Sequence, residues 1–254
     1  LEIKEKNLGK FHPDLLMTQE NLGQIFNQQD KLEMAEEIFN RGLISLSRVL
    51  GDSNERVASI HNCLGVLMNK KGDFESGIRH YKKALKIRLD KLGHDHPNVA
   101  LSYSNLGSAY CDKGEYDRAI EYHEKSLMIR LDKLGHDHPN VATSYNNLGW
   151  GYNKKGEYDQ AIQYYEKALK IRLDKLGPDH PDVAIYYNNL GAAYDNKVEY
   201  NRAIEYKAMA KWSELRTQGQ FLEKVDPVAF EKEVGIPYSR AIEIEEALKA
   251  GNSA

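Results

Sequence analysis

The chain repeats itself every 42 residues, and this periodicity constrains its fold more than any other feature. The string from Arg88 to Ala100 returns unchanged from Arg130 to Ala142. A Leu-Gly pair recurs at the same interval, at positions 22–23, 64–65, 106–107, 148–149 and 190–191. A unit this short cannot bury its apolar face alone, so several copies must stack on one another. The repeat therefore predicts a linear array whose copies contact only their neighbours.

Residues 11–221 hold five copies, which cover residues 12–53, 54–95, 96–137, 138–179 and 180–221. Residues 1–10 are in register with the end of a copy, since Leu1 and Gly9 align with Leu85 and Gly93. We therefore expect them to be the tail of a truncated preceding repeat. Residues 222–254 contain no further Asn-Leu-Gly segment. Because the end of an array must shield it from water, we expect these residues to form C-terminal capping helices.

The apolar spacing within each copy is that of two helices. In the fourth copy, apolar residues recur at intervals of three and four, as Val141, Tyr145, Leu148 and Tyr152. Pro139 suits the first turn of that helix, and Gly156 is typical of its end. A second helical run extends from Tyr158 to Leu173. No segment alternates as an ordinary strand does, so the sequence predicts an all-α protein built of antiparallel helix pairs.

Composition excludes several classes of protein. The 35 Lys and Arg residues against 38 Asp and Glu give a net charge of −3, which offers no field to attract nucleic acid. No apolar run approaches the roughly 18 residues of a membrane-spanning helix. The two cysteines, Cys63 and Cys111, are too few for a disulfide scaffold. We therefore expect a cytoplasmic protein with no membrane or nucleic-acid partner.

These repeats resemble a known family. Tyr145-Asn-Asn-Leu-Gly-Trp-Gly-Tyr152, followed by Gly156-Glu-Tyr158, resembles the tetratricopeptide repeat (TPR), which usually spans about 34 residues. The 42-residue variety, with its Leu-Gly-x-Asp-His-Pro junction, is similar to the TPR domain of kinesin light chains. The resemblance implies a right-handed superhelical solenoid of helix pairs. It also implies a concave groove lined by the first helix of each pair.

By position, the resemblance implies that the residue before each Leu-Gly pair faces the groove. These residues are Asn21, Cys63, Asn105, Asn147 and Asn189. An Asn amide both donates and accepts hydrogen bonds, which suits contact with a peptide backbone. The alternative is that these amides bond to adjacent helices and only fix the superhelix. We call these five positions the ladder. Cys63 interrupts its run of asparagines under either interpretation.

Neighbouring groove positions add Asn146, Asn188 and Trp150 to the predicted peptide-binding residues. Trp150 either stacks on a ligand side chain or packs against the next repeat. The positions that precede and follow the Leu-Gly pair carry no Lys or Arg. Repeats that clamp a terminal carboxylate need such cations, so we do not expect a carboxylate clamp.

No metal, cofactor or catalytic site is predicted. The triplets His94-Asp-His96 and His136-Asp-His138 lack further ligands at metal-binding spacing and are interpreted as helix-start residues. The recurring tyrosines occupy packing positions of the family pattern, so they are interpreted as core. The sequence shows no phosphate-binding loop and no nucleophile motif.

The sequence thus predicts a non-enzymatic protein-interaction scaffold or adaptor that binds a peptide segment of a partner in its groove. A second hypothesis is a regulatory or oligomerising arm of a larger signalling or effector protein. In that case the groove would hold another domain of the same protein or a second copy, and exposed repeat ends would allow weak self-association.

Overall fold

The computed structural model describes residues 13–178, 180–217, 226–234, 239 and 242–243. The chain divides into two units, residues 1–133 and 134–254, which are described separately. The first holds the pairs α2 (Pro13–Gln28) and α3 (Leu32–Leu50), α4 (Glu55–Lys70) and α5 (Phe74–Leu92), and α6 (Pro97–Lys113) and α7 (Tyr116–Leu134). The second holds α8 (Pro139–Lys155) and α9 (Tyr158–Leu176), α10 (Pro181–Asn196) and α11 (Tyr200–Thr217), and α12 (Pro227–Val234).

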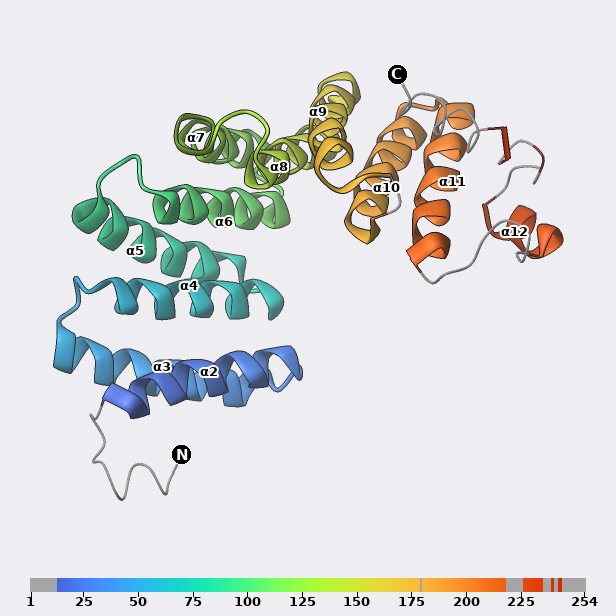
Figure 1. The fold of residues 1–254 in the computed structure, drawn as a ribbon. Helices are drawn as coiled ribbons and strands as arrows, with labels where there is room; N and C mark the ends of the chain where they lie inside the picture. Colours follow the sequence, from blue (N-terminus) through green and yellow to red (C-terminus); the bar gives the residue numbers. More distant parts are fainter. Residues whose placement is uncertain (1–12, 179, 218–225, 235–238, 240–241, 244–254) are drawn as a thin grey trace. The chain divides into compact units, whose positions relative to one another are not determined.

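The described residues contain helices and no strand, so the all-α prediction is confirmed. Within each unit, consecutive helices pack side by side, as Figure 1 shows for α4 and α5. Each of the five pairs falls within one 42-residue copy of the sequence. Residues 1–10 and most of 222–254, predicted as a repeat tail and as capping helices, lie outside the described residues.

The junction histidines begin the first helices of three copies. The Nδ1 atom of His138 accepts a hydrogen bond from the backbone N–H of Asn140 at 3.0 Å, and His96 and His180 do the same in their copies. Proline follows each of these histidines in the first turn. Gly156 ends the first helix of the fourth copy with a φ of 88°, a left-handed conformation that glycine adopts without strain. The predicted helix-start role is thus confirmed for His96 and His138 of the two His-Asp-His triplets.

A glycine lets the two helices of a pair approach closely. A Cβ atom at Gly149 would lie 2.6 Å from the ring of Tyr165 on the partner helix. Gly65 has the same relation to Tyr81. In the first four copies an aromatic ring therefore fills the space that a side chain on the first helix would need, which explains the glycine after Leu; in the fifth copy Lys207 and the Ala203 carbonyl lie over Gly191 instead.

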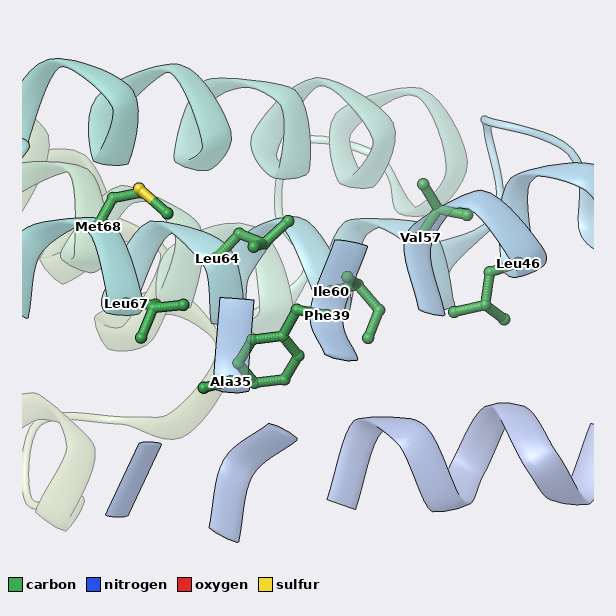
Figure 2. Packing of buried hydrophobic residues seen from close by; sticks show 8 residues of the cluster. All are labelled: Ala35, Phe39, Leu46, Val57, Ile60, Leu64, Leu67 and Met68. Carbon is green, nitrogen blue, oxygen red and sulfur yellow. The ribbon is translucent and has the colours of Figure 1, made fainter. Parts of the chain in front are cut away.

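The core continues from one copy to the next. Figure 2 shows the side chains of α3 meeting those of α4, the first helix of the following copy. The buried members are Ala35, Phe39, Leu46, Val57, Ile60, Leu64, Leu67 and Met68. The first and second copies thus share one core, as the short repeat requires.

Tyr103, Tyr110, Tyr145, Tyr152, Tyr187 and Tyr194 make ring contacts within their helix pairs, as predicted, whereas the prediction is wrong for Tyr200, which is 58% exposed. Tyr110 and Tyr122 stack with ring centroids 5.4 Å apart and planes within 3° of parallel. Lys125 Nζ lies 5.2 Å from the centroid of Tyr122, which adds a cation–π contact. Tyr152 and Tyr164 repeat the stack in the fourth copy.

The last helix described, α12, packs on α11 through two aromatic rings. Trp212 and Phe230 are stacked with centroids 4.8 Å apart and are 4% and 2% exposed. The corresponding position of earlier copies is exposed, as Met128 is in α7. α12 therefore covers a surface of α11 that remains open on other second helices.

Candidate functional site

The first helices share a stripe of accessible side chains. Its members follow one another at intervals of four, three and four residues, which keeps them on one helix face. We call this the outer stripe, and all its residues are exposed or half-buried. It comprises residues 17, 21, 24 and 28 in α2; 59, 63, 66 and 70 in α4; 101, 105, 108 and 112 in α6; 143, 147, 150 and 154 in α8; and 185, 189, 192 and 196 in α10.

The predicted ladder residues lie on this stripe, and two of them bond to the preceding copy. Asn105 Nδ2 donates to Asn62 Oδ1 at 2.5 Å, and Asn189 Nδ2 donates to Asn146 Oδ1 at 2.7 Å. The inter-helix amide bonds that the sequence left as an alternative are therefore present at these two positions. An Asn amide has a second N–H and two acceptor lone pairs, so one such bond does not exhaust it.

The other predicted site residues lie at different degrees of exposure. Asn21 and Asn188 are exposed, whereas Asn147 and Trp150 are half-buried. Asn147, Trp150, Asn188, Asn146 and Asn189 all belong to α8 and α10 of the second unit. Five of the seven predicted residues thus lie on two neighbouring helices.

A second row of polar contacts links the far ends of the first helices. Asn196 Nδ2 donates to Asn153 Oδ1 at 3.0 Å in the second unit. In the first unit, Asn69 Nδ2 lies 3.4 Å from Asp112 Oδ2. Contacts between amide or carboxylate groups of successive copies therefore recur along the first helices.

Sequence reasoning missed the apolar members of the stripe. Met17, Leu101 and Ile185 are 58%, 41% and 56% exposed and lie one turn before Asn21, Asn105 and Asn189. The four-residue interval to the asparagines was the available signal, because it places both on one helix face. The stripe thus pairs an apolar side chain with an amide in the first, third and fifth copies.

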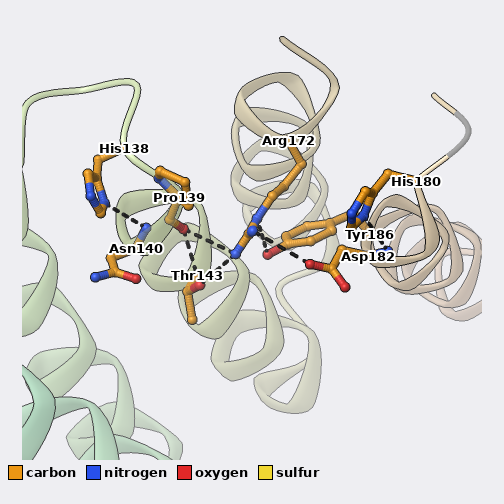
Figure 3. A network of polar contacts seen from close by, with 8 residues as sticks. All are labelled: His138, Pro139, Asn140, Thr143, Arg172, His180, Asp182 and Tyr186. Atoms are coloured by element: carbon orange, nitrogen blue, oxygen red, sulfur yellow. Dashed lines mark hydrogen bonds and ion pairs between the residues drawn. The ribbon is translucent and has the colours of Figure 1, made fainter. Parts of the chain in front are cut away.

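A network centred on Arg172 joins successive first helices in the second unit, as Figure 3 shows. From α9, its guanidinium donates to Thr143 Oγ1 at 3.2 Å and to Tyr186 Oη at 3.0 Å. Asp182 Oδ2 lies 3.9 Å from Nη1 of Arg172 and forms an ion pair with it. In the first unit, Arg88 is 5% exposed and donates to Ser102 Oγ at 2.8 Å.

This arginine was not singled out from the sequence. The signal was its return at one position of three copies, as Arg88, Arg130 and Arg172, with leucine three residues before it and four residues after it on the same helix face. In the second unit, Arg172 contacts both α8 and α10. It therefore positions the two helices that carry most of the predicted site.

Neither Lys70 nor Cys63 of the outer stripe has the surroundings of a reactive group. Lys70 Nζ lies 2.6 Å from Asp30 Oδ1 and donates to the carbonyl of Asn27 at 2.8 Å. Burial raises the pKa of the Cys63 thiol, and Gln24 Nε2 lies 3.9 Å from its sulfur. A thiol with a raised pKa holds its proton at neutral pH and is a poor nucleophile.

The described part of the chain contains no group of three or more His, Cys, Asp or Glu side chains arranged to hold a metal ion. Within the same residues, every helix is too short or too polar to traverse a lipid bilayer.

Comparison with known proteins finds tetratricopeptide repeats both by sequence and by structure. A family model described as tetratricopeptide repeat matches residues 56–132, 99–174 and 152–210. The crystal structure of BtubC (BKLC) from P. vanneervenii has a TM-score of 0.71 at 23% identity and covers 82% of this chain and 83% of that chain. A putative kinesin light chain from Podosopora anserina with nearly identical TPR-like repeats has a TM-score of 0.70 at 21% identity, covering 82% and 98%. Among curated proteins, no sequence matches this chain.

Proposed function

The chain belongs to the tetratricopeptide repeat family, which indicates a protein-interaction scaffold, and we propose that it holds a peptide segment of a partner along the outer stripe. The supporting observation is the accessible stripe itself, in which an exposed apolar side chain lies one turn before an asparagine in the first, third and fifth copies. The proposal assigns backbone contacts to Asn105, Asn147 and Asn189, with Asn21 as a weaker end contact. No catalytic role is proposed.

The chemistry of the stripe suits an extended peptide. A row of amides can bond the main chain of any sequence, so it contributes affinity without selecting side chains. Selectivity then rests on what lies between the amides. In the second unit this is the half-buried Trp150 with the exposed Ile185 and Asn188, which suit an apolar or aromatic anchor flanked by a polar residue.

The inter-copy hydrogen bonds support this assignment rather than compete with it. Asn189 is held by Asn146, so its side chain loses little further rotamer freedom when a ligand binds. The arginine network adds rigidity, because Arg172 contacts Thr143 of the stripe directly. A preorganised row of donors and acceptors costs less entropy on binding than mobile side chains do.

Panning a displayed peptide library tests the proposal. The targets are the parent chain, a variant with Asn105, Asn147 and Asn189→Ala, and the control Asn98→Ala. The control also removes an amide bond between copies, from Asn98 to Glu55, but at a position outside the stripe. Circular dichroism establishes that all three proteins are folded.

We expect peptides that bind the parent and Asn98→Ala and lose at least tenfold affinity for the triple variant. Each lost backbone hydrogen bond contributes about 0.5–1.5 kcal/mol, so three together exceed that factor. Peptides that bind all three proteins equally would show that these asparagines only hold neighbouring helices together and do not contact the peptide.

The second hypothesis, an oligomerising arm, has its own supporting observation. Ile25 in α2 is 46% exposed, whereas Leu67 and Ala109 at the same position of later copies are fully buried. An apolar position exposed at the first copy favours stacking against another helix. Sedimentation over a hundredfold concentration range separates the hypotheses, since a mass that rises with concentration supports the arm.

A further inference from the structure

The second copy departs from the three that follow it at one packed pair. In the third and fourth copies, two tyrosines contact each other between the helices of the pair, as Tyr103 does with Tyr122. The second copy has His61 and His80 at these positions. The two histidines are 19 residues apart in sequence, and the packing of α4 against α5 brings them together.

Their geometry suits shared binding of one ion. The two Nδ1 atoms are 3.0 Å apart, and the ring planes are inclined by 43°. Zinc and similar cations bind imidazole nitrogen at about 2.0–2.1 Å, so two such bonds at a tetrahedral angle place the nitrogens about 3.3 Å apart. To bind one ion, the nitrogens need to separate by a few tenths of an ångström, and each ring must turn so that its Nδ1 points to the ion and no longer to the other ring.

An approach for an ion exists beside His61. This ring lines a hollow of about 470 Å³ whose other polar residues are Ser47, Ser53, Asp52, Asp90, Lys83 and Lys86, so two carboxylates and two ammonium groups face the space. Leucine occupies the position of Ser47 in all four following copies, for example at Leu89. The shorter serine leaves space where those copies carry a larger apolar side chain, and that space can hold water molecules on the open side of an ion.

We propose that His61 and His80 form a two-histidine site for a divalent transition metal of the zinc, nickel and copper class. One ring donates its Nδ1 proton to the other in the hydrogen-bonded pair. On binding, that proton moves to Nε2 of the same ring, and both Nδ1 lone pairs point to the ion. Water completes the coordination. Among divalent ions of this class, copper binds nitrogen ligands most tightly.

The test uses the chain without an affinity tag and after treatment with a chelator. Zinc or nickel is added in steps while thermal unfolding is followed by circular dichroism. We expect the midpoint to rise by about 5 °C at saturating metal, since an ion that binds only the folded state stabilises it. Electron paramagnetic resonance of one added equivalent of copper should show hyperfine splitting from two nitrogen ligands.

The matched variant is H61Y/H80Y, which restores the tyrosine pair of the third and fourth copies and is therefore expected to fold. It should lose the metal-dependent rise and the nitrogen splitting. The control H94Q/H136Q removes two exposed junction histidines and should keep both. An unchanged midpoint in the parent, or a rise that persists in H61Y/H80Y, overturns the proposal. A two-nitrogen copper spectrum that is kept in H94Q/H136Q supports it independently of how H61Y/H80Y folds, and its loss in H94Q/H136Q overturns it.

Discussion

Acid should destabilise the third copy through a single buried histidine. His123 in α7 is 1% exposed, and neither of its ring nitrogens has a hydrogen-bond partner. Its ring fills the space over Gly107, where a Cβ atom would lie 2.5 Å away. Burial, assisted by the charge of Arg130, lowers the pKa of His123 from 6.5 to about 4.

The sign and size of the effect follow from this shift. In the unfolded chain His123 takes up a proton near pH 6.5, whereas in the folded chain it stays neutral until the pH falls to about 4. The associated stability is therefore fully present above pH 6.5 and is lost as the pH falls through 6.5 toward 4. At pH 5 the loss is about 2 kcal/mol, and below pH 4 it reaches about 3 kcal/mol.

The assay compares unfolding by urea at pH 7.5 and pH 5.0 in the parent and in His123→Tyr. Tyrosine stands over the glycine at this position of the second and fourth copies, so the variant has a native precedent. We expect the parent to lose about 2 kcal/mol more than the variant between the two pH values, since other titrating groups are common to both. His136→Gln, at an exposed junction, controls for the loss of one histidine. Equal losses in the parent and His123→Tyr would refute the reasoning.

Three further substitutions test the packing by urea unfolding at pH 7.5. Ser126→Ala removes a buried hydroxyl without a hydrogen-bond partner, where the fourth copy has Ala168, and should stabilise by about 1 kcal/mol; a loss would mean that the hydroxyl is satisfied in solution. Val198→Gly should also stabilise, by about 1 kcal/mol, because Val198 adopts a φ of 68° that β-branched residues disfavour. Gly149→Ala should destabilise by about 1–2 kcal/mol, because its Cβ meets the buried Tyr165 ring at 2.6 Å; a neutral result would show that the ring can move.

Much of the fold could be predicted because each copy repeats the same local signals. The first helix of the fourth copy begins after His138 and ends at Gly156, as the proline and glycine positions indicated. Helix starts and ends depend on residues close in sequence, so they are readable without tertiary structure. Most of the tyrosines were assigned correctly to packing for the same reason, since helical spacing identifies the buried face.

The partners of polar side chains could not be predicted in the same way. Helical spacing places Asn105 on an accessible face, but its bond to Asn62 depends on how far α6 lies from α4. The meeting of His61 with His80 similarly depends on the register between two helices. The guanidinium of Arg172 contacts α8 and α10, whose separation no local pattern encodes. Side-chain partners across helices require the tertiary structure.

The departures from the repeat indicate where the array should open first. His61, His80 and His123 replace packing residues in the second and third copies, and burial lowers the pKa of each. All three lie in the first unit, in copies that contact only their neighbours. Proton uptake at any of them therefore destabilises its own copy before it affects distant ones. At pH 5, amide hydrogen exchange should rise more in α4 to α7 than in α8 to α10, relative to pH 7 and after correction for intrinsic rates. The opposite order would contradict a local effect of these buried imidazoles.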